Sequence, residues 1–425
     1  MIYEKIRFWV VKNGLIHTSR FAILQIEINP GGIRMHYYER ARQLTQETVE
    51  HRRYFHANAE VGLELPGTKA YVMDRLREAG IEPRDCGHGV TATVGWGGRC
   101  ILLRADMDAL PMPEESGESF ACTTGTEAHA CGHDLHAAML LTAAKLLKEN
   151  EDNLKGTVKF MFQPAEETFE GAYDMVDHSI LEDPRPDVAM TYHVSSGNMA
   201  PGGFSYNHSG TMMFSVDGFR ITVTGRGAHG AYPHSAIDPI NIAVHIYQAM
   251  QSILAREVDP QKACIMTVCT FHAGTANNII PNEAEMTGTI RCNDQRNREL
   301  MKKRLTELTE QTAAAFGGSA KVTWVSQVPP LVCDPKLVDD IVRYMGELGI
   351  PGMEGREGVV SCASEDFAVL TSRMPASFMY LAAGFPEDTH PAPSHNPRVR
   401  YNEAVLPMGA ACYAQCATRW LEENQ

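Results

Sequence analysis

The shortest segment with clear chemical potential is Cys131-Gly132-His133. A cysteine and a histidine two positions apart, with a glycine between them, can turn toward one point in a loop. Thiolate and imidazole are strong ligands for zinc and for neighbouring transition metals. Taken alone, such a pair is more often a coincidence than a metal site. His136 is a further candidate ligand by spacing, although it would lie one turn into the following helix.

The acidic pair Glu166-Glu167 and the histidine His193 strengthen the pattern. Each follows an apolar run that is typical of a buried strand. A metal-dependent hydrolase needs one carboxylate as a ligand and another as a base that takes a proton from water. Paired acids on a surface loop are usually only solvated, so each feature has an ordinary explanation by itself. Together, at the ends of strands, they indicate a hydrolytic metal site.

Three apolar runs are predicted to be the buried strands that deliver these residues: 100–105, 157–162 and 187–192. The first ends at Asp106, the second leads into the acidic pair, and the third ends at His193. In open α/β sheets, sites form where the carboxyl ends of the strands meet. The apolar pattern of Leu135–Leu147 predicts a buried helix between the first two runs, with Asp134 suited to be its N-cap.

The middle of the chain predicts a separate α+β unit. Its expected elements are a strand at 219–224, a helix at 238–256, strands at 264–271 and 284–292, a helix at 295–316 and a strand at 320–325. This βαββαβ order is typical of a small sandwich, and it interrupts the larger α/β domain. We therefore predict an atypical extension over 1–34, a catalytic domain in two parts, 35–216 and 328–425, and an inserted domain over 217–327.

Several longer motifs occur in order from about Met35 to the C-terminus. They are RADMDALP at 104–111, HACGHD at 129–134, FQPAEE at 162–167, GRGAHGAYPH at 225–234, ANNIIP at 276–281, SEDF at 364–367 and His395-Asn396. With these motifs the sequence resembles the M20 family of metallopeptidases. Within that family it is similar to the amidohydrolase branch, which includes hippurate hydrolases, N-acyl-amino-acid deacylases and plant auxin-conjugate hydrolases.

The resemblance implies a zinc-peptidase-like α/β/α catalytic domain with a ferredoxin-like inserted domain that serves as lid and dimerisation domain. It also implies two divalent metal ions per subunit, which could be manganese, zinc, cobalt or nickel. Cys131 would bridge the two ions as a thiolate. His133 and His193 would complete the site of one ion, and Glu167 and His395 that of the other.

The resemblance assigns further roles around the metals. Glu166 would act as general base and acid, and Asp106 would orient a ligand from behind it. His229 would reach the site of the partner subunit and stabilise the oxyanion. Asn277, which matches a family motif, would bind the substrate's carboxylate. Arg291 is predicted to do the same from its chemistry and not from the resemblance, because a guanidinium suits bidentate carboxylate recognition.

A substitution at one position separates the branches of the family. The wider family has a metal-binding histidine two residues before the aspartate, whereas this chain has Arg104 there and His133 elsewhere. The expected activity is therefore hydrolysis of the amide bond of small N-acyl amino acids. The alternatives are a dipeptidase or carboxypeptidase on the same scaffold, and a binding homologue without catalysis. The presence of all five ligands and of Glu166 argues against the last.

Composition excludes some partners. The 425 residues include 38 basic and 52 acidic ones and carry a net charge of −14, which disfavours binding to nucleic acid. No apolar run reaches the roughly 18–20 residues that span a bilayer. The eleven scattered cysteines suggest reduced thiols and a cytoplasmic protein.

The segment 225–230 matches the dinucleotide-binding pattern G-x-G-x-x-G. A loop follows it, whereas nucleotide binding would need a helix to begin there.

Residues 1–34 lack clear periodicity and end in Asn29-Pro30-Gly31-Gly32 before the helical pattern that follows Met35. Two explanations are equally open. Met35 could be the true start, with the preceding residues translated from upstream sequence, or the segment could be an added strand or arm. Mass spectrometry of the native N-terminus distinguishes them.

Overall fold

The computed structural model describes residues 27–29, 32–208 and 210–425, and the chain divides into two compact units, Met1–His36 and Tyr37–Gln425. The described part of the first unit is the antiparallel hairpin of β1 (Glu27–Asn29) and β2 (Gly32–Arg34). Most of the predicted N-terminal extension lies outside the described residues. Within the described parts of the chain, no helix combines the length and apolar character needed to cross a membrane.

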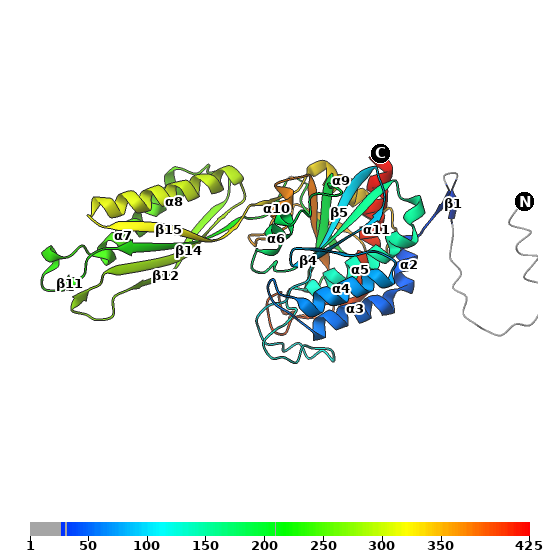
Figure 1. Cartoon of the computed structure of the whole chain (residues 1–425), viewed down its shortest axis with the longest axis horizontal. Coiled ribbons are helices and arrows are strands. Elements are labelled where there is room, and N and C mark those ends of the chain that lie inside the picture. Colours follow the sequence, from blue (N-terminus) through cyan, green and yellow to red (C-terminus); the bar gives the residue numbers. More distant parts are fainter. Residues whose placement is uncertain (1–26, 30–31, 209) are drawn as a thin grey trace, which may run out of the picture. The chain divides into compact units, whose positions relative to one another are not determined.

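The second unit contains an eight-stranded mixed sheet, labelled in part in Figure 1. Its order is β17 (Gly355–Glu357), β8 (Phe204–Tyr206), β18 (Ala376–Ala382), β7 (Val188–Ser195), β5 (Arg99–Asp106), β6 (Gly156–Gln163), β4 (Gly89–Gly95) and β3 (Arg84–Cys86). The central strands β18, β7, β5 and β6 run parallel. Every residue of β6 is buried, as expected for a central parallel strand. The three predicted strands are confirmed, and their carboxyl ends lie at one edge.

Helices accompany this sheet. They are α2 (Tyr37–Gln43), α3 (Thr45–Ala57), α4 (Pro66–Glu78), α5 (His133–Glu149), α6 (Gly171–Asp177), α9 (Pro335–Gly346), α10 (Ala368–Thr371) and α11 (Leu406–Glu423). Helix α5 buries all its residues except Lys145, Lys148 and Glu149. It packs against α11, and both contact β5. An α-helix that is apolar on nearly all sides belongs in a core, so the predicted buried helix is confirmed.

The start of α5 differs from the prediction. Gly132, in the left-handed conformation, occupies the N-cap position, and Asp134 lies inside the first turn. The Asp134 carboxylate instead accepts hydrogen bonds from the buried side chains of Arg52 (3.0 Å) and His56 (2.8 Å). The predicted N-cap role of Asp134 is therefore wrong, because a buried ion pair with α3 takes its carboxylate.

The inserted α+β unit has the predicted βαββαβ order. Its elements are β10 (Val216–Thr224), α7 (Pro239–Arg256), β12 (Cys264–Ala273), β14 (Glu283–Cys292), α8 (Gln295–Ala315) and β15 (Ser319–Val328). The strands form an antiparallel sheet in the order β12-β14-β10-β15. Alternate residues of β10, among them Phe219 and Ile221, pack against Ile246 of α7 and Leu305 of α8. Both helices therefore cover the same face of the sheet (Figure 1).

A buried ion cluster fixes α8 to the first strand of this unit. The fully buried Asp217 of β10 accepts hydrogen bonds from Arg298 at 2.7 and 2.9 Å and lies 2.9 Å from the ammonium of Lys302. Loss of the carboxylate would leave the buried guanidinium without its counter-ion.

Asp217→Asn is therefore expected to lower the free energy of unfolding by about 3–5 kcal/mol, measured by denaturant titration of the full chain. The control is Glu285→Gln, which removes the exposed pair with Arg220 and should cost less than about 1 kcal/mol. Equal effects of the two substitutions would contradict the anchoring role of Asp217.

Candidate metal centre and active site

Three strands of the mixed sheet, one buried helix and one long connection bring the candidate residues together. Strand β5 ends at Asp106, β6 leads through Pro164 into Glu166 and Glu167, and β7 carries His193 near its end. Helix α5 begins at His133, two residues after Cys131. His395 comes from the long connection between β18 and α11, where its backbone amide donates to the carbonyl of Ala130 (2.9 Å).

Cys131 lies at the centre of the cluster. Its sulfur is 3.4 Å from Nε2 of His193 and 3.3 Å from Nε2 of His395, and the latter nitrogen is 3.3 Å from a Glu167 oxygen. The potential ligand atoms of Cys131, His133 and His193 lie within 4.8 Å of one another, and so do those of Cys131, Glu167 and His395. The structure thus contains two adjacent donor sets that share one sulfur.

Hydrogen bonds place the lone pairs of two histidines inside the cluster. Nδ1 of His133 donates to the carbonyl of Asp108 (2.9 Å), and Nδ1 of His193 donates to the carbonyl of Val194 (2.7 Å). In each neutral ring Nε2 is consequently the unprotonated nitrogen. Backbone carbonyls behind histidine ligands commonly fix the tautomer in this way.

Nε2 of His133 is buried and has no hydrogen-bond partner among the described residues, and Oε1 of Glu167 has only the 3.3 Å contact with Nε2 of His395. Buried polar atoms in proteins almost always have a hydrogen-bond partner or a bound ion. The His133 nitrogen and the Glu167 oxygen therefore indicate that a further group binds between them. Burial also raises the pKa of the Cys131 thiol and lowers the pKa of His193 to about 3. A divalent cation would satisfy the His133 nitrogen and the Glu167 oxygen and stabilise the thiolate, so these residues fit a metal.

The loop of Cys131 depends on a glycine. Gly132 has a φ of +89°, and a Cβ atom there would lie 2.4 Å from a methyl group of Val194. Any other residue would therefore push the loop away from β7, which carries His193.

Gly132→Ala is expected to weaken metal binding by about 10-fold or more, because the clash with Val194 adds to the roughly 1–2 kcal/mol that a left-handed conformation costs a residue with a Cβ, and the loop of Cys131 must shift. Equilibrium dialysis with metal analysis measures this. Gly117→Ala is the matched control, because Gly117 has a φ of +76° but open space where the added methyl group would lie. Similar metal affinity in both variants would contradict the argument.

The acidic pair is oriented by Asp108. The Asp108 carboxylate accepts from the backbone amides of Glu166 (3.0 Å) and Glu167 (3.1 Å). Ala165, immediately before them, has a φ of +51°, an uncommon conformation for a residue with a side chain. This sharp bend lets Glu167 face Cys131 and His395 and places Glu166 beside Glu365 and Asp366, while both carboxylates lie 3.9 Å from Nε2 of His133.

The environment of Glu166 favours its protonated form. Burial, followed by the negative charges of Glu365 and Glu167, raises the pKa of Glu166 well above its usual range. A carboxyl group with raised proton affinity, next to a candidate metal site, suits a general base that later returns the proton as an acid.

Of the network behind Glu166, only Asp106 has a role predicted from the sequence. The buried guanidinium of Arg104 donates to Asp106 (2.6 Å), Glu365 (2.8 Å) and Asp366 (3.1 Å). Although burial alone would raise the pKa of Asp106, the charge of Arg104 lowers it well below its usual range. The available signal was an arginine inside an apolar strand together with the SEDF motif, because a buried arginine needs carboxylate partners.

The predicted residues of the inserted unit are not part of the cluster within this chain. His229, in the short strand β11 (Ala228–His229), is exposed, and its Nδ1 accepts from the backbone amide of Ala231 (3.1 Å). Asn277 is exposed. Arg291, in β14, donates to the carbonyl of Cys362 (3.1 Å) and to the hydroxyl of Ser364 (2.9 Å).

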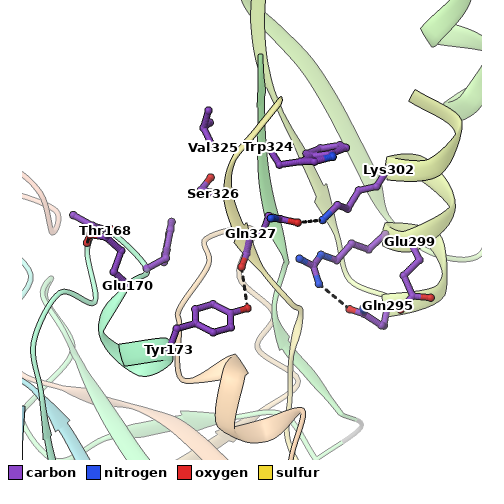
Figure 2. Close-up of a pocket in the computed structure, with 12 residues that line it drawn as sticks. Thr168, Glu170, Tyr173, Gln295, Glu299, Lys302, Trp324, Val325, Ser326 and Gln327 are labelled. Carbon is purple, nitrogen blue, oxygen red and sulfur yellow. Dashed lines mark hydrogen bonds between the residues drawn. The ribbon is translucent and has the colours of Figure 1, made fainter. Parts of the chain in front are cut away.

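A cavity of about 660 Å³ lies beside the segment that follows Glu167. Figure 2 shows Tyr173 at its wall, with its hydroxyl donating to the carbonyl of Gln327 (3.0 Å), and Lys302 near Trp324. None of the residues with a predicted role in chemistry lines this cavity. Its cations, Arg298 and Lys302, already pair with Asp217. The candidate metal centre around Cys131 is therefore separate from this cavity.

Comparison with known proteins identifies the class to which this fold and cluster belong. The model of peptidase family M20/M25/M40 matches residues 102–419, so the chain belongs to this family. The family and the fold class predicted from the sequence are thereby confirmed.

Particular relatives differ in the reactions that their names describe. The chain is 34% identical to an N-acetyl-L-cysteine deacetylase of Bacillus subtilis strain 168 over 386 residues, 90% of each chain. It is 33% identical to thermostable carboxypeptidase 2 of Saccharolobus solfataricus over 388 residues, 89% of this chain and 96% of the relative. The solved structure of Bacillus subtilis YXEP protein, described as a dinuclear metal-binding peptidase of the M20 family, covers 90% of this chain and 99% of its own, at 28% identity and a TM-score of 0.75.

Proposed function

We propose that this protein is a metal-dependent amidohydrolase that cleaves N-acyl amino acids into a carboxylic acid and a free amino acid. The observation that carries the proposal is the pair of donor sets sharing the Cys131 sulfur, with the carboxyl group of Glu166 beside them. Similarity to a deacetylase supports the same reaction.

The proposed cofactor is a pair of divalent ions, manganese, zinc, cobalt or nickel. Cys131 would be shared between them, His133 and His193 would complete one donor set, and Glu167 and His395 would complete the other. The dinuclear description of the YXEP protein supports two ions. When bound, such ions supply Lewis acidity that polarises an amide carbonyl and lowers the pKa of water.

The chain's own residues handle the proton and hold the substrate. Glu166 takes the proton of the attacking water and delivers it to the nitrogen of the leaving amine, so that it returns to its starting state. Asp106 holds the surroundings of the ligands in place. Asn277 and Arg291 bind the amino-acid carboxylate, and Arg291 must then exchange its contacts with Cys362 and Ser364 for that carboxylate.

A substrate panel tests the proposal against its nearest rival. N-acetyl and N-benzoyl amino acids and unblocked dipeptides are assayed with the protein loaded with each of the four metals. Turnover of the N-acyl compounds above that of the dipeptides supports the proposal. A preference for dipeptides would favour the peptidase reaction that the carboxypeptidase relative suggests, and no turnover by metal-loaded protein would favour an inert binding homologue.

The proposed assembly is a homodimer through the inserted unit, in which His229 serves the partner's site. The exposed position of His229 and exposed apolar side chains on α7, among them Val244 and Tyr247, support this. The proposed location is the cytoplasm, since all eleven cysteines are free thiols.

Mixing two inactive variants tests the role of His229. A dimer of one His229→Ala chain and one Glu166→Ala chain has one doubly defective site and one intact site. With random pairing, about a quarter of the parental activity is expected to return. Absence of recovery, with subunit exchange confirmed by mass spectrometry, would contradict action across the interface.

A further inference from the structure

His136 occupies a fully buried position between two elements of the site. Its Nδ1 lies 2.5 Å from an oxygen of Asp106, at the end of β5. Its Nε2 lies 2.8 Å from the backbone nitrogen of Val194, in β7. The ring thus connects the ends of two neighbouring parallel strands from the first turn of α5.

The tautomer of this ring follows from its hydrogen-bond partners. The backbone N–H of Val194 can only donate, so Nε2 of His136 must offer a lone pair. The proton of the neutral ring is therefore on Nδ1, where it is donated to Asp106. Both nitrogens are engaged, and neither is free to bind a metal, although His136 lies within 4.8 Å of donor atoms of Asp106 and His133.

The ring of His136 is linked to the candidate ligand His193 through the backbone of Val194. The amide of Val194 is held by His136, and the carbonyl of Val194 accepts from Nδ1 of His193. The second oxygen of Asp106 is held by Arg104 (2.6 Å). Arg104, Asp106, His136 and Val194 therefore form a continuous chain of hydrogen bonds that ends at the ring of His193.

We propose that His136 is a positioning residue for metal binding: it fixes the β7 segment that aims His193 at Cys131, and it holds Asp106 in place. The proposed role of His136 rests on one part of the proposed function, namely that the residues around Cys131 bind metal. Partners behind metal ligands typically contribute about 10–100-fold in metal affinity.

The test compares two substitutions of buried histidines in the full chain. His136→Phe keeps a ring and removes both hydrogen bonds. His51→Phe is the matched control, since His51 is also buried and contacts Tyr71 (2.9 Å) rather than the cluster. Affinity for Co²⁺ and Zn²⁺ is measured by competition with a chromogenic chelator, and the absorption spectrum of the Co²⁺ form reports the geometry around the ions.

We expect His136→Phe to bind metal about 10–100-fold more weakly and to alter the Co²⁺ spectrum, while still taking up the parental number of ions at saturation. His51→Phe should match the parent in both measurements. His136→Phe with parental affinity and spectrum would overturn the proposal. Loss of one full equivalent of metal at saturation would also overturn it, because His136 would then be a ligand.

Two conservative variants separate positioning from simple packing and serve if His136→Phe does not fold. His136→Gln can still accept from the Val194 amide, and His136→Asn can still donate to Asp106. At least one should bind metal more tightly than a His136→Ala variant, whereas equal weakness of all three would overturn the proposal. Failure of the proposed function would appear differently, as a parent protein that binds metal but cleaves no N-acyl amino acid.

Discussion

Glu166→Gln is expected to lower kcat by about 10²–10⁴-fold while the protein keeps its full complement of metal. The amide has nearly the shape of the carboxyl group but cannot accept the proton of water. Glu166 belongs to no donor set that contains Cys131, so its replacement should leave those sets intact. Steady-state kinetics on the best substrate of the panel, together with metal analysis of the same preparation, measures both quantities.

Glu167→Gln is the informative contrast, because the two residues are neighbours on one bend and differ in their partners. Glu167 lies against His395, and its variant should lose metal. If the Glu166 variant instead loses metal and keeps its activity per bound ion, the two roles are reversed.

Cys131→Ser is expected to weaken the binding of both ions by at least about 100-fold. Loss of a residue that only hydrogen-bonds to a metal ligand costs up to about 100-fold in affinity, and loss of a ligand should cost more. The sulfur is the one atom common to both donor sets, and a serine hydroxyl is a poor substitute for a bridging thiolate. Metal content after exhaustive dialysis and chelator competition measure the loss.

Cys122→Ser provides the matched control for this substitution. Cys122 is also buried and precedes Cys131 in the same stretch of chain, but its sulfur contacts the hydroxyl of Thr124 (3.2 Å) and belongs to neither donor set. It should retain both ions. A Cys131→Ser protein that holds two equivalents after the same dialysis would show that the sulfur is not a bridge.

Elements with a strong periodic pattern could be predicted from the sequence. Helix α5 was predictable because its apolar residues recur on all faces, and the inserted unit because its strands and helices alternate over about one hundred residues. The boundaries were less accurate. Strand β15, predicted over 320–325, extends over Ser319–Val328, because alternate exposed positions continue the strand beyond its apolar residues.

The network of Arg104 shows where sequence reasoning ends. Its partner Glu365 is 261 positions away, and no local pattern links an arginine in a strand to a carboxylate after the inserted unit. The fate of Asp134 has the same cause, since Arg52 and His56 reach it only through the packing of α3 on α5. The residue types in the sequence indicate the chemistry of the site. Tertiary packing decides which charged side chains pair with one another, and the sequence does not show this.

The two donor sets differ in when the growing polypeptide can supply them. Cys131, His133 and His193 all precede the inserted unit, whereas the set with Glu167 is completed only by His395, after that unit and after β18. At roughly 5–20 residues per second, the ribosome needs on the order of ten seconds or more to travel from His193 to His395. The nascent chain therefore contains the three residues of one donor set before the inserted unit is made, whereas the other set spans that unit and depends on the last part of the chain.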